Sequence, residues 1–402
     1  MRIGVVSSFP PTIGGISDYA SHVAEYLAVD SRVESVTVFA DKLPGMPAHQ
    51  RIGRVEVRRV WRRNGIGTGP ALVRALETLQ PDVVWFNLGL TMFGTRPIAA
   101  ASGLVAPLAT TLLGYRTVVT LHELPALADL GALGLRSRLG RVGALLVPRL
   151  VLRASAVVVT LDRYRRFLIE RYGAGNIRRI PLGAHDRTRY EAEPDQETAL
   201  VFGTFGPHKE PGLVAEAIAH LRQRRPNLQL IVAGADHPRF PGFMADCCAR
   251  HGLDGSWVGY VPAERLAALF GGATVVVVPS MASTGSSGVI YRAVSHARAV
   301  IASDLPDLRG LAQDEDLKLT WFAPGDPIGL AAALDFLLSD ADQRRGLVRH
   351  NLQTIERLKP AKIVDAYLAV FDDPRRPDDV AEMSRVATIG GLVPALSTGG
   401  EA

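Results

Sequence analysis

The chain has 402 residues, of which 47% are hydrophobic and 21% are charged. This composition excludes a largely disordered chain, and the length exceeds what one hydrophobic core fills, so we expect two domains. Residues 1–185 contain 23 Lys and Arg and 12 Asp and Glu, a net charge of +11, whereas the remainder contains 22 and 28, a net charge of −6. The basic half favours an anionic partner such as a membrane surface, a phospholipid or an anionic acceptor. No helix-turn-helix, zinc-finger or RNA-binding motif accompanies the arginines, which argues against nucleic acid.

The N-terminus enters an apolar segment within a few residues and has no signal-peptide pattern, so we expect a cytoplasmic protein. The first half then alternates short strand-like runs with longer helix-like stretches, which is typical of a parallel sheet covered by helices. The expected strands are Arg2–Ser7, Val33–Phe39, Val55–Val60, Val83–Phe86, Thr117–Leu121 and Ala156–Thr160. Between the first two, Ser17–Leu27 has helical spacing of its apolar residues.

Two segments of this half raise the question of a membrane. Residues 96–116 have no charge between the terminal arginines, but several Pro and Gly interrupt them, which favours a buried helix over a spanning one. The segment Leu135–Arg153 combines five arginines with leucine and valine side chains such as Leu139, Val142, Leu145, Leu146, Leu150 and Val151, and has no acidic residue. This is the composition of a basic amphipathic helix on a membrane surface, and equally of an ordinary helix with solvated arginines.

A charged linker at Asp186–Glu197 separates a second α/β unit. The strands expected there are Ala199–Gly203, Leu228–Ala233, Ser256–Val258, Thr274–Pro279, Ala299–Ala302 and Leu317–Trp321. The only cysteines, Cys247 and Cys248, are adjacent, so we expect neither an ordinary disulfide nor a spaced metal site. Terminal helices are expected from Asp340 to Phe371, followed by a loose tail over 374–402.

Three loops have the composition of ligand-binding turns. Gly14-Gly15 lies between the first strand and the first helix, where free amides favour an anion. Gly206-Pro207-His208-Lys209 ends a strand and presents a flexible cation before a helix, which suits a diphosphate. The third loop, from Ser283 to Gly288, is rich in glycine and hydroxyl groups that suit phosphate or ribose. Each motif alone also fits a plain turn. The Gly14-Gly15 loop does not match the dinucleotide fingerprint, and no Walker loop is present.

The order of these elements resembles the family 4 retaining glycosyltransferases of the GT-B fold over about the first 370 residues. The matching segments are Gly14-Gly15, Thr120-Leu121-His122-Glu123, Ile180-Pro181-Leu182-Gly183, Gly206-Pro207-His208-Lys209, Gly259-Tyr260-Val261 and Ala263–Pro279. The resemblance implies an α/β fold of two Rossmann-like domains facing across a cleft. Residues 1–185 would bind the acceptor and 186–355 the nucleotide sugar, and a terminal helix over 356–373 would pack back on the first domain.

The resemblance also implies site residues. His122 would contact the donor sugar, Lys209 would neutralise the diphosphate, and Gly259, Tyr260 and Val261 would hold the base. Gly14, Gly15, Gly206 and the loop residues Ser283, Thr284, Gly285, Ser286, Ser287 and Gly288 complete the expected donor site.

The chain departs from the family pattern at two acidic positions. Where the family has one glutamate near the sugar and another eight positions later near the ribose, this sequence has Thr284 and Arg292. Gly206 stands where the family commonly has an arginine. Arg292 could compensate by binding phosphate through its guanidinium.

The expected activity is transfer of a hexose from a nucleotide sugar, with retention and without a metal or other cofactor. The acceptor would be a lipid, a polysaccharide or a small molecule, and a lipid acceptor would place the enzyme at the inner face of the membrane. Because the two glutamates are missing, a catalytically silent GT-B binding protein stays open as an alternative, as does a GT-B epimerase.

Overall fold

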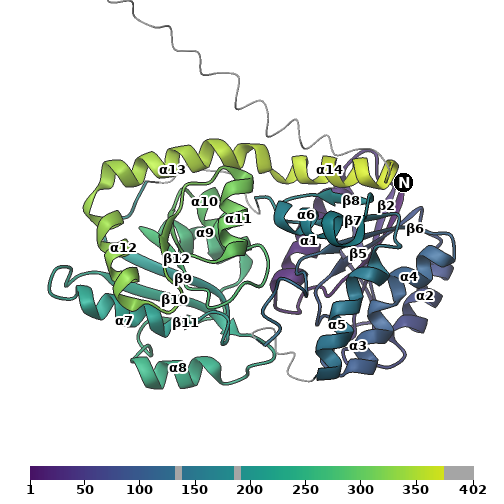
Figure 1. Ribbon diagram of the computed structural model, residues 1–402, viewed down its shortest axis with the longest axis horizontal. Coiled ribbons are helices and arrows are strands. Elements are labelled where there is room, and N and C mark those ends of the chain that lie inside the picture. Colours follow the sequence, from purple (N-terminus) through teal and green to yellow (C-terminus); the bar gives the residue numbers. More distant parts are fainter. Residues whose placement is uncertain (132–137, 185–191, 375–402) are drawn as a thin grey trace, which may run out of the picture.

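The structure is a computed structural model that describes residues 1–131, 138–184 and 192–374. It contains two α/β units side by side, each with its own sheet (Figure 1). The expected tail beyond residue 374 and the first half of the expected linker, residues 186–191, lie outside the described residues.

The first sheet has the strand order β3-β4-β2-β1-β5-β6-β7-β8, and every pairing is parallel except that of β3 with β4. Its strands are β1 (Arg2–Val6), β2 (Ser35–Asp41), β3 (His49–Ile52), β4 (Val55–Trp61), β5 (Val83–Leu88), β6 (Arg116–Leu121), β7 (Ala156–Val159) and β8 (Ile177–Arg179). The central strands are buried along their whole length, which explains their continuous apolar runs.

The helices of this unit are α1 (Gly15–Val29), α2 (Thr68–Leu79), α3 (Pro97–Leu104), α4 (Ala106–Leu112), α5 (Arg138–Val151) and α6 (Asp162–Tyr172). The single buried helix expected over 96–116 is wrong, because the segment forms the two short helices α3 and α4. Each has a proline in its first turn, where proline is tolerated. Within the described residues, no helix has both the length and the apolar character needed to cross a membrane.

The second sheet has the order β11-β10-β9-β12-β13-β14 and is parallel throughout. Its strands are β9 (Thr198–Phe205), β10 (Gln229–Asp236), β11 (Trp257–Gly259), β12 (Val275–Val278), β13 (Ala299–Ser303) and β14 (Thr320–Phe322). Its helices are α7 (Gly212–Leu221), α8 (Phe243–His251), α9 (Ala263–Gly271), α10 (Gly288–Ser295), α11 (Pro306–Glu315) and α12 (Pro327–Ser339). The order reverses between β9 and β12, as it does between β1 and β5 in the first sheet, and ligands of such sheets bind where it reverses.

The chain then returns to the first unit along one side of the molecule (Figure 1) through α13 (Ala341–Ile355), a short turn η1 (Glu356–Leu358) and α14 (Pro360–Asp372). Helix α14 packs on α1 and β6, and the Tyr367 hydroxyl lies 3.0 Å from that of Tyr19 and 2.9 Å from Thr120 Oγ1. A large hydrophobic cluster is therefore continuous from the first sheet through α14 to one face of the second sheet.

Two strands, β3 and β8, were not predicted. The sequence of β3 is polar because it is an edge strand with exposed positions. In β8, Arg178 and Arg179 hide the strand pattern, yet both are buried. Arg179 makes an ion pair of 2.6 Å with Glu315 of α11, and the two side chains are only 10% and 4% exposed. This pair joins the two units.

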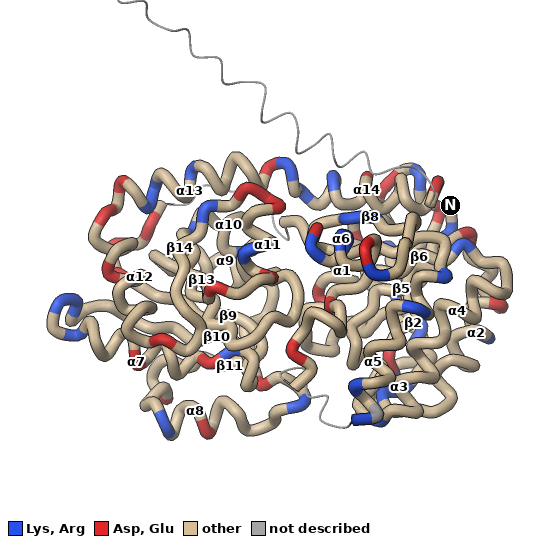
Figure 2. The backbone as a smooth tube through the Cα atoms, in the orientation of Figure 1, with Lys and Arg blue, Asp and Glu red and all other residues tan. Residues whose placement is uncertain are grey.

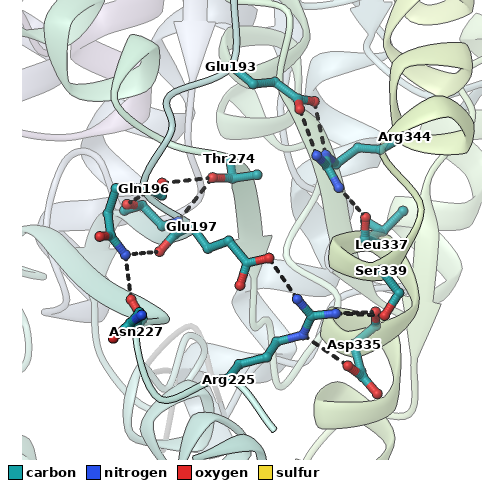
Figure 3. Close-up of polar contacts among 11 residues, drawn as sticks. Glu193, Gln196, Glu197, Arg225, Asn227, Thr274, Asp335, Leu337, Ser339 and Arg344 are labelled. Atoms are coloured by element: carbon teal, nitrogen blue, oxygen red, sulfur yellow. Dashed lines mark hydrogen bonds and ion pairs between the residues drawn. The ribbon is translucent and has the colours of Figure 1, made fainter.

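A polar cluster anchors the start of the second unit to its last helices (Figure 3). Arg344 of α13 donates to both carboxylate oxygens of Glu193, at 2.9 and 2.6 Å, and to the Leu337 carbonyl oxygen at 2.5 Å. The nearby guanidinium of Arg225 joins Glu197 to Asp335 of α12. These contacts fix the chain that enters β9.

Replacing Arg344 by methionine is expected to lower the free energy of unfolding by about 3 kcal/mol, because Glu193 would lose its partner in a mostly buried place. Arg345→Met is the matched control. Arg345 pairs with Asp342 at the surface, so its loss should cost less than about 1 kcal/mol. Chemical denaturation of both variants measures the difference, and equal losses would contradict this assignment.

Candidate active site

A cleft with a volume of about 680 Å³ lies between the two units, where the carboxyl ends of both sheets face each other. It is lined by the loops after β1, β5 and β6 on one side and after β9, β10, β11 and β12 on the other. All the site residues proposed from the sequence line it except Gly206 and Gly259. Folding thus brings together segments more than 250 residues apart.

Two helices begin at this cleft without a side-chain cap. Helix α1 follows Gly14, which has a φ of 151°, and α10 follows Ser287. Their first amides therefore have no side-chain acceptor within their own caps, and such amides favour an anion. The buried hydroxyl oxygens of Ser17 and Ser283 also belong to residues lining the cleft, and neither has a hydrogen-bond partner among the described residues.

His122 follows β6 and is held in one orientation. Its Nε2 lies 2.6 Å from Asn87 Oδ1, while the Asn87 amide nitrogen donates to Ser7 Oγ and to the Ile16 carbonyl oxygen. Since Asn87 Oδ1 can only accept, Nε2 carries the proton and Nδ1 is left as an acceptor. Burial lowers the pKa of His122 to about 4, so the imidazole is neutral at pH 7. Its Nδ1 can accept a hydrogen bond from a ligand hydroxyl and so orient the ligand, but the imidazole is a poor base.

The next residue, Glu123, has a structural contact of its own. Its Oε2 accepts from the Leu90 amide at 2.9 Å, and burial raises the pKa of its carboxyl. From the opposite unit, Arg239 donates to Thr91 Oγ1, and the remaining Nε and Nη1 of Arg239 have no partner within the described part of the chain. Burial lowers the pKa of Arg239 to about 10, and the charge of Glu123 opposes this shift. Glu123 and Arg239 therefore belong to one electrostatic group at the cleft.

Lys209 lies in the cleft, with its ammonium group against the backbone of β9. Its Nζ lies 3.2 Å from the Phe202 carbonyl oxygen and above Gly203, where a Cβ atom would come within 2.7 Å of it. Burial lowers the pKa of Lys209 to about 8. A buried ammonium group with so few partners gains from an anion placed beside it.

The loop Ser283–Gly288 is tied to the first unit by Asp307, which is fully buried in α11. One oxygen of its carboxylate accepts from the Gly285 amide at 2.9 Å and from the Tyr164 hydroxyl at 2.8 Å, and the other pairs with Arg163. Gly285 itself touches the first unit, because a Cβ there would lie 2.4 Å from the His122 carbonyl oxygen. The loop and His122 thus pack against each other on one side of the cleft.

Thr284 and Arg292 both line the cleft. Across it lies Asp18 of α1, whose pKa is raised by burial, while the positive charge of Arg292 opposes the rise. The guanidinium of Arg292 therefore interacts with a carboxylate of the first unit. The expected base-binding turn is more open, since Tyr260 is 59% exposed.

Gly206 and Gly259 do not line the cleft and support it through the backbone. Gly206 forms a bridge with Lys209, and Gly259 ends β11 with a φ of 72°, a value that favours glycine. Asn87, Asp307 and Arg239 are among the polar residues at or beside the cleft that the sequence did not predict. Asn87 had a visible signal, a polar residue at the end of an apolar run, whereas Asp307 looks like an ordinary acid in the first turn of a helix.

Comparison with known proteins supports this architecture. Residues 14–183 match the family described as glycosyl transferase 4-like domain, and residues 196–340 match glycosyl transferases group 1. A search of the curated proteins gave no match.

Solved structures are similar over nearly the whole chain. Sucrose-phosphate synthase from Thermosynechococcus elongatus has a TM-score of 0.72 and 20% identity, covering 92% of this chain and 98% of the other. HepE from Anabaena, solved in complex with UDP and glucose, has a TM-score of 0.68 and 17% identity, covering 92% and 99%. The lipopolysaccharide outer core galactosyltransferase WaaB gives 0.60 and 14%, with coverage of 92% and 99%. These likenesses confirm the expected fold class, two α/β domains of the GT-B type. Residues 14–183 and 196–340 thus each match a glycosyltransferase domain family, within a chain that has the GT-B fold.

Proposed function

We propose that this protein is a family 4 retaining glycosyltransferase that moves a hexose from a nucleotide sugar to a lipid, polysaccharide or small-molecule acceptor. The observation that carries the proposal is the convergence of His122, Lys209 and the Ser283–Gly288 loop on one interdomain cleft. HepE, similar in fold, is described with UDP-glucose, and this favours a nucleotide-sugar donor here.

The chemistry we assign to the cleft is electrostatic. The leaving diphosphate gains negative charge as the glycosidic bond breaks, and Lys209 with the amides at the start of α10 stabilises it. Neutral His122 orients the sugar through a hydrogen bond, because its ring is locked by Asn87. The proposal includes no metal, because the Lys209 ammonium group and the N–H groups at the helix N-termini stabilise the negative charge of the diphosphate.

The two departures from the family pattern change the expected donor contacts. Thr284 can offer a hydroxyl where the family has a carboxylate, and Arg292 can bind phosphate through its guanidinium once the nucleotide competes with Asp18. Arg292→Ala is expected to weaken donor affinity, measured as KM for the donor. Unchanged donor affinity and turnover would refute this role.

The experiment that tests the function is a thermal-shift screen against UDP, ADP, GDP and CDP and their glucose conjugates, followed by product analysis. One nucleoside diphosphate should stabilise the protein through binding to the native state. Lys209→Met should reduce that shift, while Lys362→Met, an exposed lysine of α14, should not. Product NMR with the stabilising donor should show retained anomeric configuration. Nucleotide binding without donor turnover would favour the silent alternative, and interconversion of the donor sugar would favour an epimerase.

We further propose that the acceptor is presented at an anionic membrane, on a face formed by α3, α4 and α5. Ile98, Leu112, Val142, Leu145 and Leu146 are large apolar residues exposed on these helices. Basic residues gather beside them (Figure 2), with Arg138, Arg141 and Arg149 on α5 and no acid in that helix. Such a face suits the boundary of a bilayer containing acidic lipids.

Sedimentation with vesicles tests this face. The protein should bind vesicles of phosphatidylglycerol and phosphatidylcholine better than phosphatidylcholine alone, and added salt should weaken the binding. The double variant Leu145→Ser/Leu146→Ser should bind several-fold less. Equal binding by that variant would show that α5 is only a solvated helix.

A further inference from the structure

The structure assigns a zinc-binding site, outside the cleft, to Glu210, Cys247 and His251. The ligand atoms these residues offer all lie within 4.8 Å of one another, the only such group of three or more metal-binding side chains among the described residues. From the sequence we expected no metal site at the cysteines, because Cys247 and Cys248 are adjacent. Folding instead pairs one of them with side chains from α8 and from the loop before α7.

The arrangement arises from the spacing of two residues on α8 and from the loop before α7, which passes beside that helix. Cys247 and His251 are four residues apart on α8, so they project from the same face of the helix. Glu210 reaches this face from the loop before α7, and its Oε1 lies 3.1 Å from Cys247 Sγ. Tetrahedral zinc with bonds of about 2.0–2.3 Å needs ligand atoms roughly 3.5 Å apart, so small side-chain rotations suffice.

His251 has the outer contact that is usual for a metal-ligating histidine. Its Nδ1 lies 3.2 Å from a carboxylate oxygen of Glu216, which fixes the ring. Its Nε2 lies 3.3 Å from the Arg250 guanidinium, a group that can only donate, so Nε2 has the lone pair. The ring also lies over Gly212, where a Cβ would come within 2.5 Å of Nε2. The Nε2 lone pair accepts from exposed Arg250 in the metal-free protein, so the Arg250 side chain must swing away when a metal binds.

The mixed donor set selects the ion. A thiolate with an imidazole and one carboxylate suits zinc, with water as the fourth ligand, and does not suit magnesium or calcium. Burial and Glu210 raise the pKa of the Cys247 thiol to about 12. Binding therefore replaces the thiol proton by the metal and releases it to solvent.

The site has a structural consequence for the cleft, although none of its three ligands lines it. Glu210 directly follows Lys209, and its amide donates to the Pro279 carbonyl oxygen at 3.2 Å. A metal held by Glu210, Cys247 and His251 would connect α8 to this loop and limit its movement behind the Lys209 ammonium group.

Titration with cobalt(II), followed by displacement with zinc, tests the site in the whole chain. The wild type should bind one cobalt per chain, with a sulfur-to-metal charge-transfer band in the near ultraviolet and about one proton released. Cys247→Ser should lose the band. Cys248→Ser is the matched control, since Cys248 is also buried but belongs to no such group, and it should keep the band.

Two further variants keep the test independent of a folding defect. His251→Gln lies at the end of α8 and should weaken zinc binding by at least about 100-fold, while Glu216→Gln should weaken it about 10- to 100-fold. Circular dichroism checks that each variant is folded. The site is refuted if the wild type gives no thiolate band, or if Cys247→Ser and Cys248→Ser bind zinc equally well.

Discussion

Replacing Lys209 by methionine is expected to lower kcat/KM for the sugar donor about 100- to 1,000-fold, the cost of removing one group that stabilises developing negative charge in an enclosed site. The Lys209 ammonium group lies in the cleft beside β9 and donates to the Phe202 carbonyl oxygen. A steady-state assay with the stabilising nucleotide sugar measures the effect.

The same lysine should set the alkaline limit of activity. Burial lowers its pKa to about 8, so in the free enzyme the ammonium loses its proton as the pH rises through 8. The wild-type kcat/KM should therefore fall above pH 8, and this fall should be absent in Lys209→Met. A bound diphosphate favours the charged form, so the corresponding limit in kcat should lie at higher pH.

The melting temperature of Lys209→Met distinguishes a role in donor binding from a role in stabilising the fold. Because the charged form of Lys209 is disfavoured by desolvation, methionine should leave the melting temperature unchanged or raise it. Lys362→Met again serves as the control and should change neither activity nor stability. A large loss of melting temperature in Lys209→Met would show that the lysine holds the fold rather than the donor.

Replacing Asp307 by asparagine is expected to lower the free energy of unfolding by about 3–5 kcal/mol and to reduce activity as well. The fully buried carboxylate accepts from Arg163, Tyr164 and Gly285, so three donors converge on two oxygens. An amide has only one oxygen, and its nitrogen would face a donor, which leaves the arginine charge without a partner.

Asp304→Asn is the matched control for this prediction. Asp304 lies three residues earlier and pairs with Arg309 at 2.6 and 2.8 Å, but both side chains are about half exposed. Its replacement should cost less than about 1 kcal/mol. Denaturant unfolding and donor KM should be measured for both variants, because the loss of the Gly285 contact should also raise the donor KM. Equal behaviour of the two variants would contradict the role of Asp307 as the link between the domains.

The sequence predicted the strands that show a local hydrophobic pattern and missed those that depend on contacts with distant parts of the chain. Apolar runs such as Val83–Phe86 and Thr274–Pro279 located central strands to within a few residues, because burial on both faces leaves a continuous pattern. Edge and interface strands escaped detection, since β3 is polar and β8 buries Arg178 and Arg179 through contacts that come from elsewhere in the chain.

By itself, the sequence determined the two α/β halves, the order of their loops and the residues now found around the cleft. The halves and the loop order depend on short-range pattern and on the rule that parallel strands place their carboxyl ends at one edge. The family resemblance added His122, Tyr260 and Arg292 to the expected site. Only the tertiary structure decided the electrostatics. The neutral state of His122 comes from burial against Asn87, the low pKa of Lys209 from enclosure, and the grouping of Cys247 with Glu210 from the packing of α8 beside the loop. Such properties depend on which groups exclude water from one another, and the chain order does not encode that directly.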